Sequence, residues 1–138
     1  MPKYKLISHT ADMGLEIFGK NYKELFTNAA FGFSSLITDL KKIKPVKIHK
    51  INLKAQNIEE LFLNWLRELI FLYSAKQLIF KKFSFVKLNQ IMLESIAFGE
   101  KIDLARHAIK IDIKAVTYHQ FKIEKNKSGL KATVIFDV

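Results

Sequence analysis

The residues whose types could take part in chemistry lie near the two ends of the chain. They are the segment 9–12, which reads His-Thr-Ala-Asp, and the final pair Asp137 and Val138. Residues 132–138 alternate like a buried strand, although chain ends usually carry dispensable polar residues. Such a strand places the Asp137 carboxylate beside the α-carboxylate of Val138, and Asp12 could add a third carboxylate. Calcium and magnesium prefer all-oxygen surroundings of this kind. The sequence therefore raises the hypothesis of a hard-cation site at the chain end.

Each of these aspartates also has a structural interpretation. An aspartate in a turn, where Asp12 is expected, commonly caps backbone amides. An aspartate at the end of a strand, as expected for Asp137, is commonly just exposed to water. Spacing along the chain cannot show that the two residues meet in space, so both interpretations stay open.

The chain contains four histidines, at His9, His49, His107 and His119. His49 lies in a lysine-rich segment and is expected at the surface, while the others are expected as polar residues bonded to the backbone. No pair has the i, i+4 spacing of a helical zinc site. A metal-dependent hydrolase that combines His9 and His119 with Asp12 and Asp137 remains a third hypothesis, and it would need an open metal position and a general base.

Several function classes are excluded by what the sequence lacks. With no cysteine, the 138 residues cannot form disulfides, thiolate zinc sites, Fe–S clusters or a cysteine nucleophile. There is no glycine-rich phosphate loop, no GxGxxG and no GxSxG. We find no signal peptide and no apolar stretch long enough to span a bilayer. A cytoplasmic protein without membrane attachment is expected.

The net charge is +10, from 23 basic and 13 acidic side chains. This balance favours acidic partners and makes an RNA- or tRNA-binding chaperone that uses the basic surface the alternative function. The excess is almost entirely lysine and is spread along the whole chain, and lysine does not bind phosphate in the bidentate manner of arginine. Charge alone therefore does not decide for nucleic acid.

The expected framework is α+β, with 1–138 forming one domain in which two main helices pack on one face of a mixed or antiparallel sheet. Two capping boxes predict helix starts at Asn21 and Asn57. The strand after Pro45 changes phase between Ile48 and Ile51, which a β-bulge would explain. Alternation also predicts β-structure at residues 4–9, 14–19, 78–88, 90–98, 109–113, 121–124 and 130–138.

Three motifs in order resemble the archease family over the whole chain. They are residues 9–14 (HTADMG), residues 114–119 (KAVTYH) and residues 134–138 (VIFDV). The two capped helices, Gly99-Glu100 and Arg106-His107 fall between them in the expected order. Each motif alone is weak, but their order in a chain of this length makes the match specific.

This resemblance implies a small α+β protein that is not itself an enzyme. It implies an activator of the GTP-dependent RNA ligase of the RtcB type, which acts in tRNA splicing and RNA repair, so that tRNA is met indirectly through the ligase. The activator promotes ligase guanylylation and multiple turnover. The resemblance also implies a divalent metal, typically calcium with magnesium, manganese or zinc as alternatives, held by Asp12, Asp137 and Val138. His9, Arg106 and His119 would support the site or contact the partner.

Overall fold

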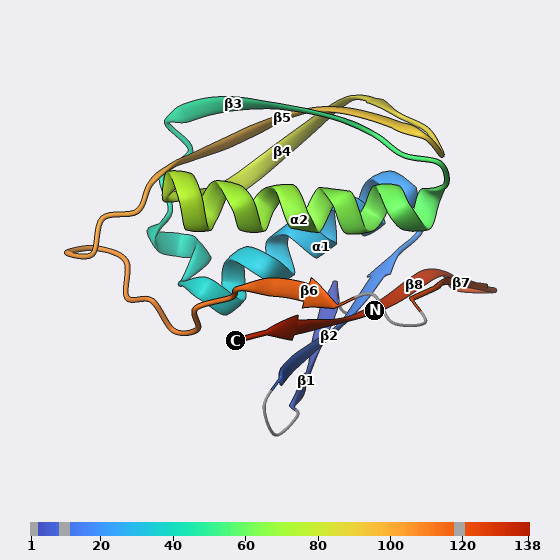
Figure 1. Cartoon of the computed structure of the whole chain (residues 1–138), viewed down its shortest axis with the longest axis horizontal. Coiled ribbons are helices and arrows are strands. Elements are labelled where there is room, and N and C mark those ends of the chain that lie inside the picture. Colours follow the sequence, from blue (N-terminus) through green and yellow to red (C-terminus); the bar gives the residue numbers. More distant parts are fainter. Residues whose placement is uncertain (1–2, 9–11, 118–120) are drawn as a thin grey trace.

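The computed structural model describes residues 3–8, 12–117 and 121–138. Two strands precede the first helix, one strand lies between the helices, and five strands follow the second long helix (Figure 1). In order they are β1 (Tyr4–Ser8), β2 (Asp12–Gly19), α1 (Tyr22–Ile37), the short 3-10 helix η1 (Leu40–Lys42), β3 (Lys47–Lys54), α2 (Ile58–Lys76), β4 (Leu78–Leu88), β5 (Met92–Lys101), β6 (Ala115–Thr117), β7 (Ile123–Asn126) and β8 (Gly129–Asp137).

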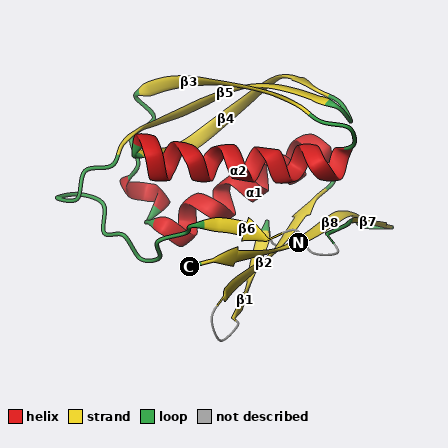
Figure 2. Cartoon of the chain, viewed as in Figure 1, coloured by secondary structure: helices red, strands yellow, loops and turns green. Residues whose placement is uncertain are grey.

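The strands form two antiparallel sheets, and both helices lie in a layer between them (Figure 2). The first sheet has the order β1-β2-β8-β6, with β7 also pairing with β8, and the second has the order β3-β5-β4. The α+β class is thus confirmed, but the expectation of one sheet was wrong. The helices show why: each buries residues around more than one face, including Leu63 and Tyr73 in α2, and a single sheet covers only one face.

Both predicted helix starts are confirmed. The Asn21 side chain accepts a hydrogen bond from the Glu24 backbone N–H at 2.9 Å, and Asn57 accepts one from Glu60 at 2.8 Å. Each glutamate carboxylate reaches back to the backbone N–H one residue before the cap, at Lys20 and Gln56. At each helix start, one unpaired donor of the first turn and the N–H just before the cap are satisfied in this way.

Two expectations about β-structure were wrong. β3 pairs with β5 without a register shift, so there is no bulge between Ile48 and Ile51; the shifts lie in β4, at Phe80/Lys82 and Phe85/Lys87. Ile48 departs from the apolar phase because it points away from the helices and is 66% exposed. The described residues 109–113 form no strand. Backbone bonds such as that from Lys110 N–H to the Ile37 carbonyl, at 2.7 Å, hold this segment to α1 instead.

The core is dense with aromatic side chains. Trp65 of α2 is fully buried and its indole N–H donates to the Phe26 carbonyl of α1 at 2.9 Å, which joins the two helices. Phe62 meets Phe26 edge-on, with ring centroids 5.1 Å apart. In the second sheet, a Cβ added to Gly99 would lie 1.9 Å from the Ile79 carbonyl oxygen, so the close approach of β5 to β4 requires glycine.

Within the described part of the chain, neither helix combines the length and the apolar character that crossing a lipid bilayer demands.

Candidate functional site

Asp12 and Asp137 are brought together by the pairing of β2 with β8. The two strands run antiparallel, and the register sets Asp12 directly opposite Asp137. Directly opposed residues project on the same face of a sheet, with Cβ atoms roughly 5 Å apart. This is the outer face, because the alternate residues Leu15 and Phe136 are buried against the helices.

The end of β8 is held firmly on both of its sides. On the side opposite β2 it pairs with β6, where Ala115 lies opposite Asp137. The Lys114 backbone N–H donates to the Asp137 carbonyl at 2.9 Å, and the Thr117 hydroxyl donates to the Ile135 carbonyl at 3.1 Å. Beneath them Phe136 is fully buried, so the Asp137 side chain has a defined place on the outer face.

The pairing places two carboxylates side by side on the outer face. Two like charges directly opposed on neighbouring strands destabilise the pairing unless something neutralises them. Asp12 is half-buried, and Asp137 and Val138 are exposed. Among the described residues no group of three or more His, Asp or Glu side chains could hold a metal ion. Oxygen donors in this number and geometry suit a hard cation whose remaining ligands are main-chain oxygens, waters or a partner's groups.

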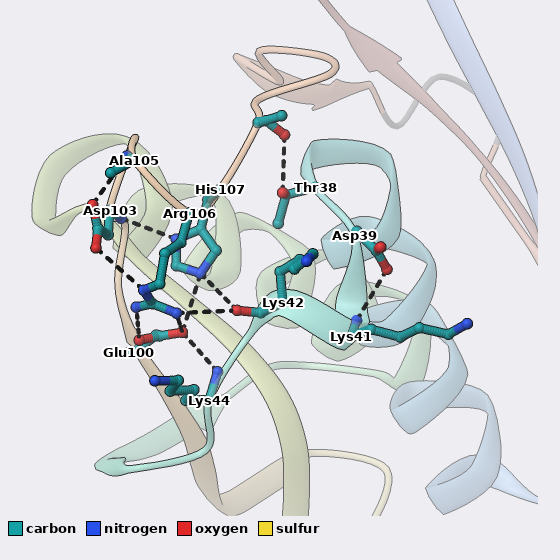
Figure 3. A network of polar contacts seen from close by, with 11 residues as sticks. Thr38, Asp39, Lys41, Lys42, Lys44, Glu100, Asp103, Ala105, Arg106 and His107 are labelled. Atoms are coloured by element: carbon teal, nitrogen blue, oxygen red, sulfur yellow. Dashed lines mark hydrogen bonds and ion pairs between the residues drawn. The ribbon is translucent and has the colours of Figure 1, made fainter.

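The other predicted site residues do not join this pair in the described part of the chain. His9 and His119 lie outside the described residues. Arg106 belongs to a separate network beside the end of β5, in the second sheet. There it bonds to Glu100, Asp103 and the Lys42 carbonyl (Figure 3). The structure therefore brings two of the six predicted residues face to face, with Val138 next to one of them.

Glu100 is the centre of that network. Its side chain is only 9% exposed and accepts hydrogen bonds from the Arg106 guanidinium and, at 2.6 Å, from the Lys44 backbone N–H. Hydrogen bonding from Arg106 lowers the pKa of Glu100 from 4.5 to about 2, and the Lys44 N–H and the charge of Arg106 act in the same direction against the effect of burial. The same contacts raise the pKa of Arg106.

His107 completes the network as a fully buried side chain. Its Nδ1 accepts the Asp103 backbone N–H at 2.9 Å, so the ring proton lies on Nε2, which donates to the Lys42 carbonyl at 2.9 Å and to Glu100 at 3.1 Å. These bonds tie residues 102–107 to η1. The expectation that His107 is bonded to the backbone is confirmed, and the pairing with Glu100 was not anticipated.

The model of the Archease protein family matches residues 4–138. The protein archease of Methanosarcina barkeri is 35% identical to this chain over 140 residues. The match covers 99% of this chain and 96% of that archease.

Two solved structures share the fold. The solution structure of Methanobacterium thermoautotrophicum protein 1598 superposes with a TM-score of 0.82 at 27% identity and covers 100% of both chains. The crystal structure of a Thermotoga maritima archease, described as a possible chaperone, gives a TM-score of 0.63 at 25% identity, covering 97% of this chain and 96% of that one.

Proposed function

This chain belongs to the archease family, and we propose that it is a non-enzymatic activator of a GTP-dependent RNA ligase of the RtcB type. The observation that carries the proposal is the pair of carboxylates, Asp12 and Asp137, opposed on the outer face of the first sheet. The description of the Thermotoga maritima relative as a possible chaperone is in keeping with a protein that assists another.

Asp12, Asp137 and a main-chain oxygen of Val138 would hold the divalent cation, for which calcium is the first candidate. The donor set fits, because the carboxylates supply negative charge and the exposure of Asp137 and Val138 leaves room for further oxygen ligands. When bound, the cation would supply positive charge for the phosphate oxygens of GTP or for ligase carboxylates. The chain's own part is to orient the two carboxylates, and rigid positioning is where phosphoryl transfer gains much of its rate.

A site that is incomplete within one chain suits an accessory factor better than an enzyme. In the described sheet the neighbours of Asp137 on the adjoining strands are Asp12 and Ala115, which add no histidine, lysine or hydroxyl group to the two carboxylates. A partner that supplies the missing ligands would bind this tip only when the carboxylates are present. The ligase would then perform the chemistry.

The test is single-turnover guanylylation of the cognate RNA ligase by GTP, with and without this protein. We expect the wild type to accelerate ligase guanylylation, and Asp12→Asn and Asp137→Asn to lose most of that acceleration while keeping the fold. Glu124→Gln is the matched control, because Glu124 is an exposed carboxylate of β7 that pairs with Lys131 of β8 on the same outer face. Thermal unfolding with calcium or with chelator gives a reading independent of the ligase: calcium should stabilise the wild type and the control only.

Two results would overturn the proposal. No stimulation by the wild type excludes the activator role. Stimulation that survives both Asp12→Asn and Asp137→Asn excludes the acidic tip as its origin.

A further inference from the structure

The second sheet has one face covered by the helices and one face open. Figure 1 shows α1 and α2 on the inner side of β3, β5 and β4, and no described element on the outer side. Solitary exposed apolar residues are ordinary, but a cluster marks an interaction surface. Four of the large apolar side chains that are more than half exposed lie on or beside this sheet: Val46 (70%), Ile48 (66%), Val86 (67%) and Ile91 (52%).

The register arranges the outer face in rows, each of which carries one lysine, either on β3 or on β4. Directly opposed residues share a face, so each row can be written from β3 through β5 to β4. The rows are Ile48-Phe98-Lys82, Lys50-Ile96-Ser84, Asn52-Glu94-Lys87 and, at the end, Lys54-Met92. The half-exposed side chains of β5 thus form a strip that is apolar except for Glu94, and exposed lysines border it on β3 and on β4.

Two local features make this surface more than a scatter of residues. The Lys82 ammonium lies 5.2 Å from the centroid of the Phe98 ring, so a cation and an aromatic face are already side by side. A shallow hollow of about 270 Å³ opens beside them, lined by Lys50, Asn52, Val86, Glu94, Ser95 and Ile96. The bulge between Phe85 and Lys87 turns Val86 into this hollow.

The outer face of the first sheet has a different charge. There the acidic residues Asp12, Glu16, Glu124 and Asp137 outnumber the lysines Lys5 and Lys131, and Lys131 is paired with Glu16 at 2.9 Å. On the second sheet only Glu94 opposes the four lysines of the rows. The four lysines and Glu94 give this open sheet face a net charge of +3, whereas the acidic residues are in excess on the strands of the opposite outer face.

We propose that the outer face of β3, β5 and β4 binds single-stranded nucleic acid. Phosphates would contact the bordering lysines Lys50, Lys54, Lys82 and Lys87, and bases would lie against the apolar strip. A duplex keeps its bases stacked inside, whereas single strands present them to flat side chains and to basic grooves. The proposal needs neither the acidic tip nor the ligase, so it stands or falls independently of the proposed function.

Fluorescence anisotropy with labelled oligo(U) and oligo(dT) tests this proposal on the full chain. The face variant is Lys50→Gln, Lys54→Gln and Lys87→Gln together. The control with equal net charge is Lys23→Gln, Lys110→Gln and Lys127→Gln, three exposed lysines away from this face. Four phosphate contacts predict that wild-type affinity falls about 50-fold between 50 and 200 mM salt. The face variant, with one contact left, should bind more weakly at low salt and lose only about threefold over that range.

Phe98→Leu separates base contact from charge. It should weaken binding roughly tenfold and leave the salt dependence unchanged, because it removes an aromatic face and no cation. Equal binding of oligo(U) and oligo(dT) would support readout of backbone and bases alone, and preference for oligo(U) would support a role on RNA. The proposal is overturned if the control variant loses as much affinity as the face variant. It is equally overturned if neither oligomer binds at low salt, which would leave the face to an acidic protein partner.

Discussion

Glu100 should make the stability of this protein depend on pH in the acid range. Its pKa is lowered from 4.5 to about 2 in the folded state, chiefly by the hydrogen bond from Arg106. A carboxyl group with a lowered folded pKa stabilises the fold at every pH above its unfolded pKa. That contribution starts to fall near pH 5, as the unfolded chain takes up the proton first, and is gone once the pH passes below about 2.

The expected size follows from the two pKa values. Their difference corresponds to about 3 kcal/mol of folding free energy at neutral pH. The Arg106 side chain is 36% exposed, so water screens the pair, and we expect roughly half of that figure. Glu100→Gln should cost at least this much at pH 7, because Arg106 and the Lys44 N–H lose their anionic acceptor. At pH 2 the wild type and the variant should be nearly equal in stability.

Urea unfolding from pH 7 to pH 2, followed by tryptophan fluorescence of the buried Trp65, measures this directly. Glu94→Gln is the matched control, since Glu94 lies on the same strand and faces outward. The difference between the wild type and Glu100→Gln should shrink as the pH falls, while that for Glu94→Gln stays small throughout. A Glu100→Gln penalty that remains constant between pH 7 and pH 3 would refute the reasoning.

Two further predictions concern other sites. Gly99→Ala should lower the free energy of unfolding by about 3 kcal/mol or more, measured by urea unfolding, because the new Cβ would lie 1.9 Å from the Ile79 carbonyl and β5 would have to move from β4. Burial and, as a smaller effect, the hydrogen bond to Asp112 raise the pKa of Tyr73 to about 12. The contribution of Tyr73 to the free energy of unfolding should therefore be lost as the pH rises from about 10 to about 12. Ultraviolet titration of the wild type should show a phenol that ionises near pH 12, which should be missing in Tyr73→Phe and shifted to lower pH in Asp112→Asn.

Local signals in the sequence predicted the local structure well. Asn21 and Asn57 begin helices because side-chain oxygens three residues before a glutamate satisfy backbone donors, which requires no tertiary contact. The hairpin around residues 126–129 is similarly local: Asn126 accepts the Ser128 N–H at 2.8 Å, and Gly129 has a φ of +131°. These features depend on residues a few positions apart and can be read from the chain.

What could not be predicted depends on contacts between distant segments. Alternation at residues 109–113 is typical of a strand, but the backbone there bonds to the end of α1 instead. The change of phase between Ile48 and Ile51 is typical of a bulge, but in the structure it arises because Ile48 is an exposed apolar residue on the outer face of β3. For the site, the sequence offered Asp12 and Asp137 as candidates, and only the register of β2 with β8 shows that they are opposed.

The layer order also separates the acidic pair from the lysines of the second sheet. A helix is about 10 Å across, so the two sheets on either side of the helix layer are roughly 20 Å apart. Charges separated by more than the Debye length, about 8 Å at physiological ionic strength, are largely screened. The lysines of the second sheet therefore do little to relieve the repulsion between Asp12 and Asp137. Neutralising Lys50, Lys54 and Lys87 should accordingly leave calcium stabilisation of the wild-type tip unchanged. A change in that stabilisation would show that the two outer faces are electrostatically coupled. The screening of their exposed charges by the salt solution would then be weaker than expected.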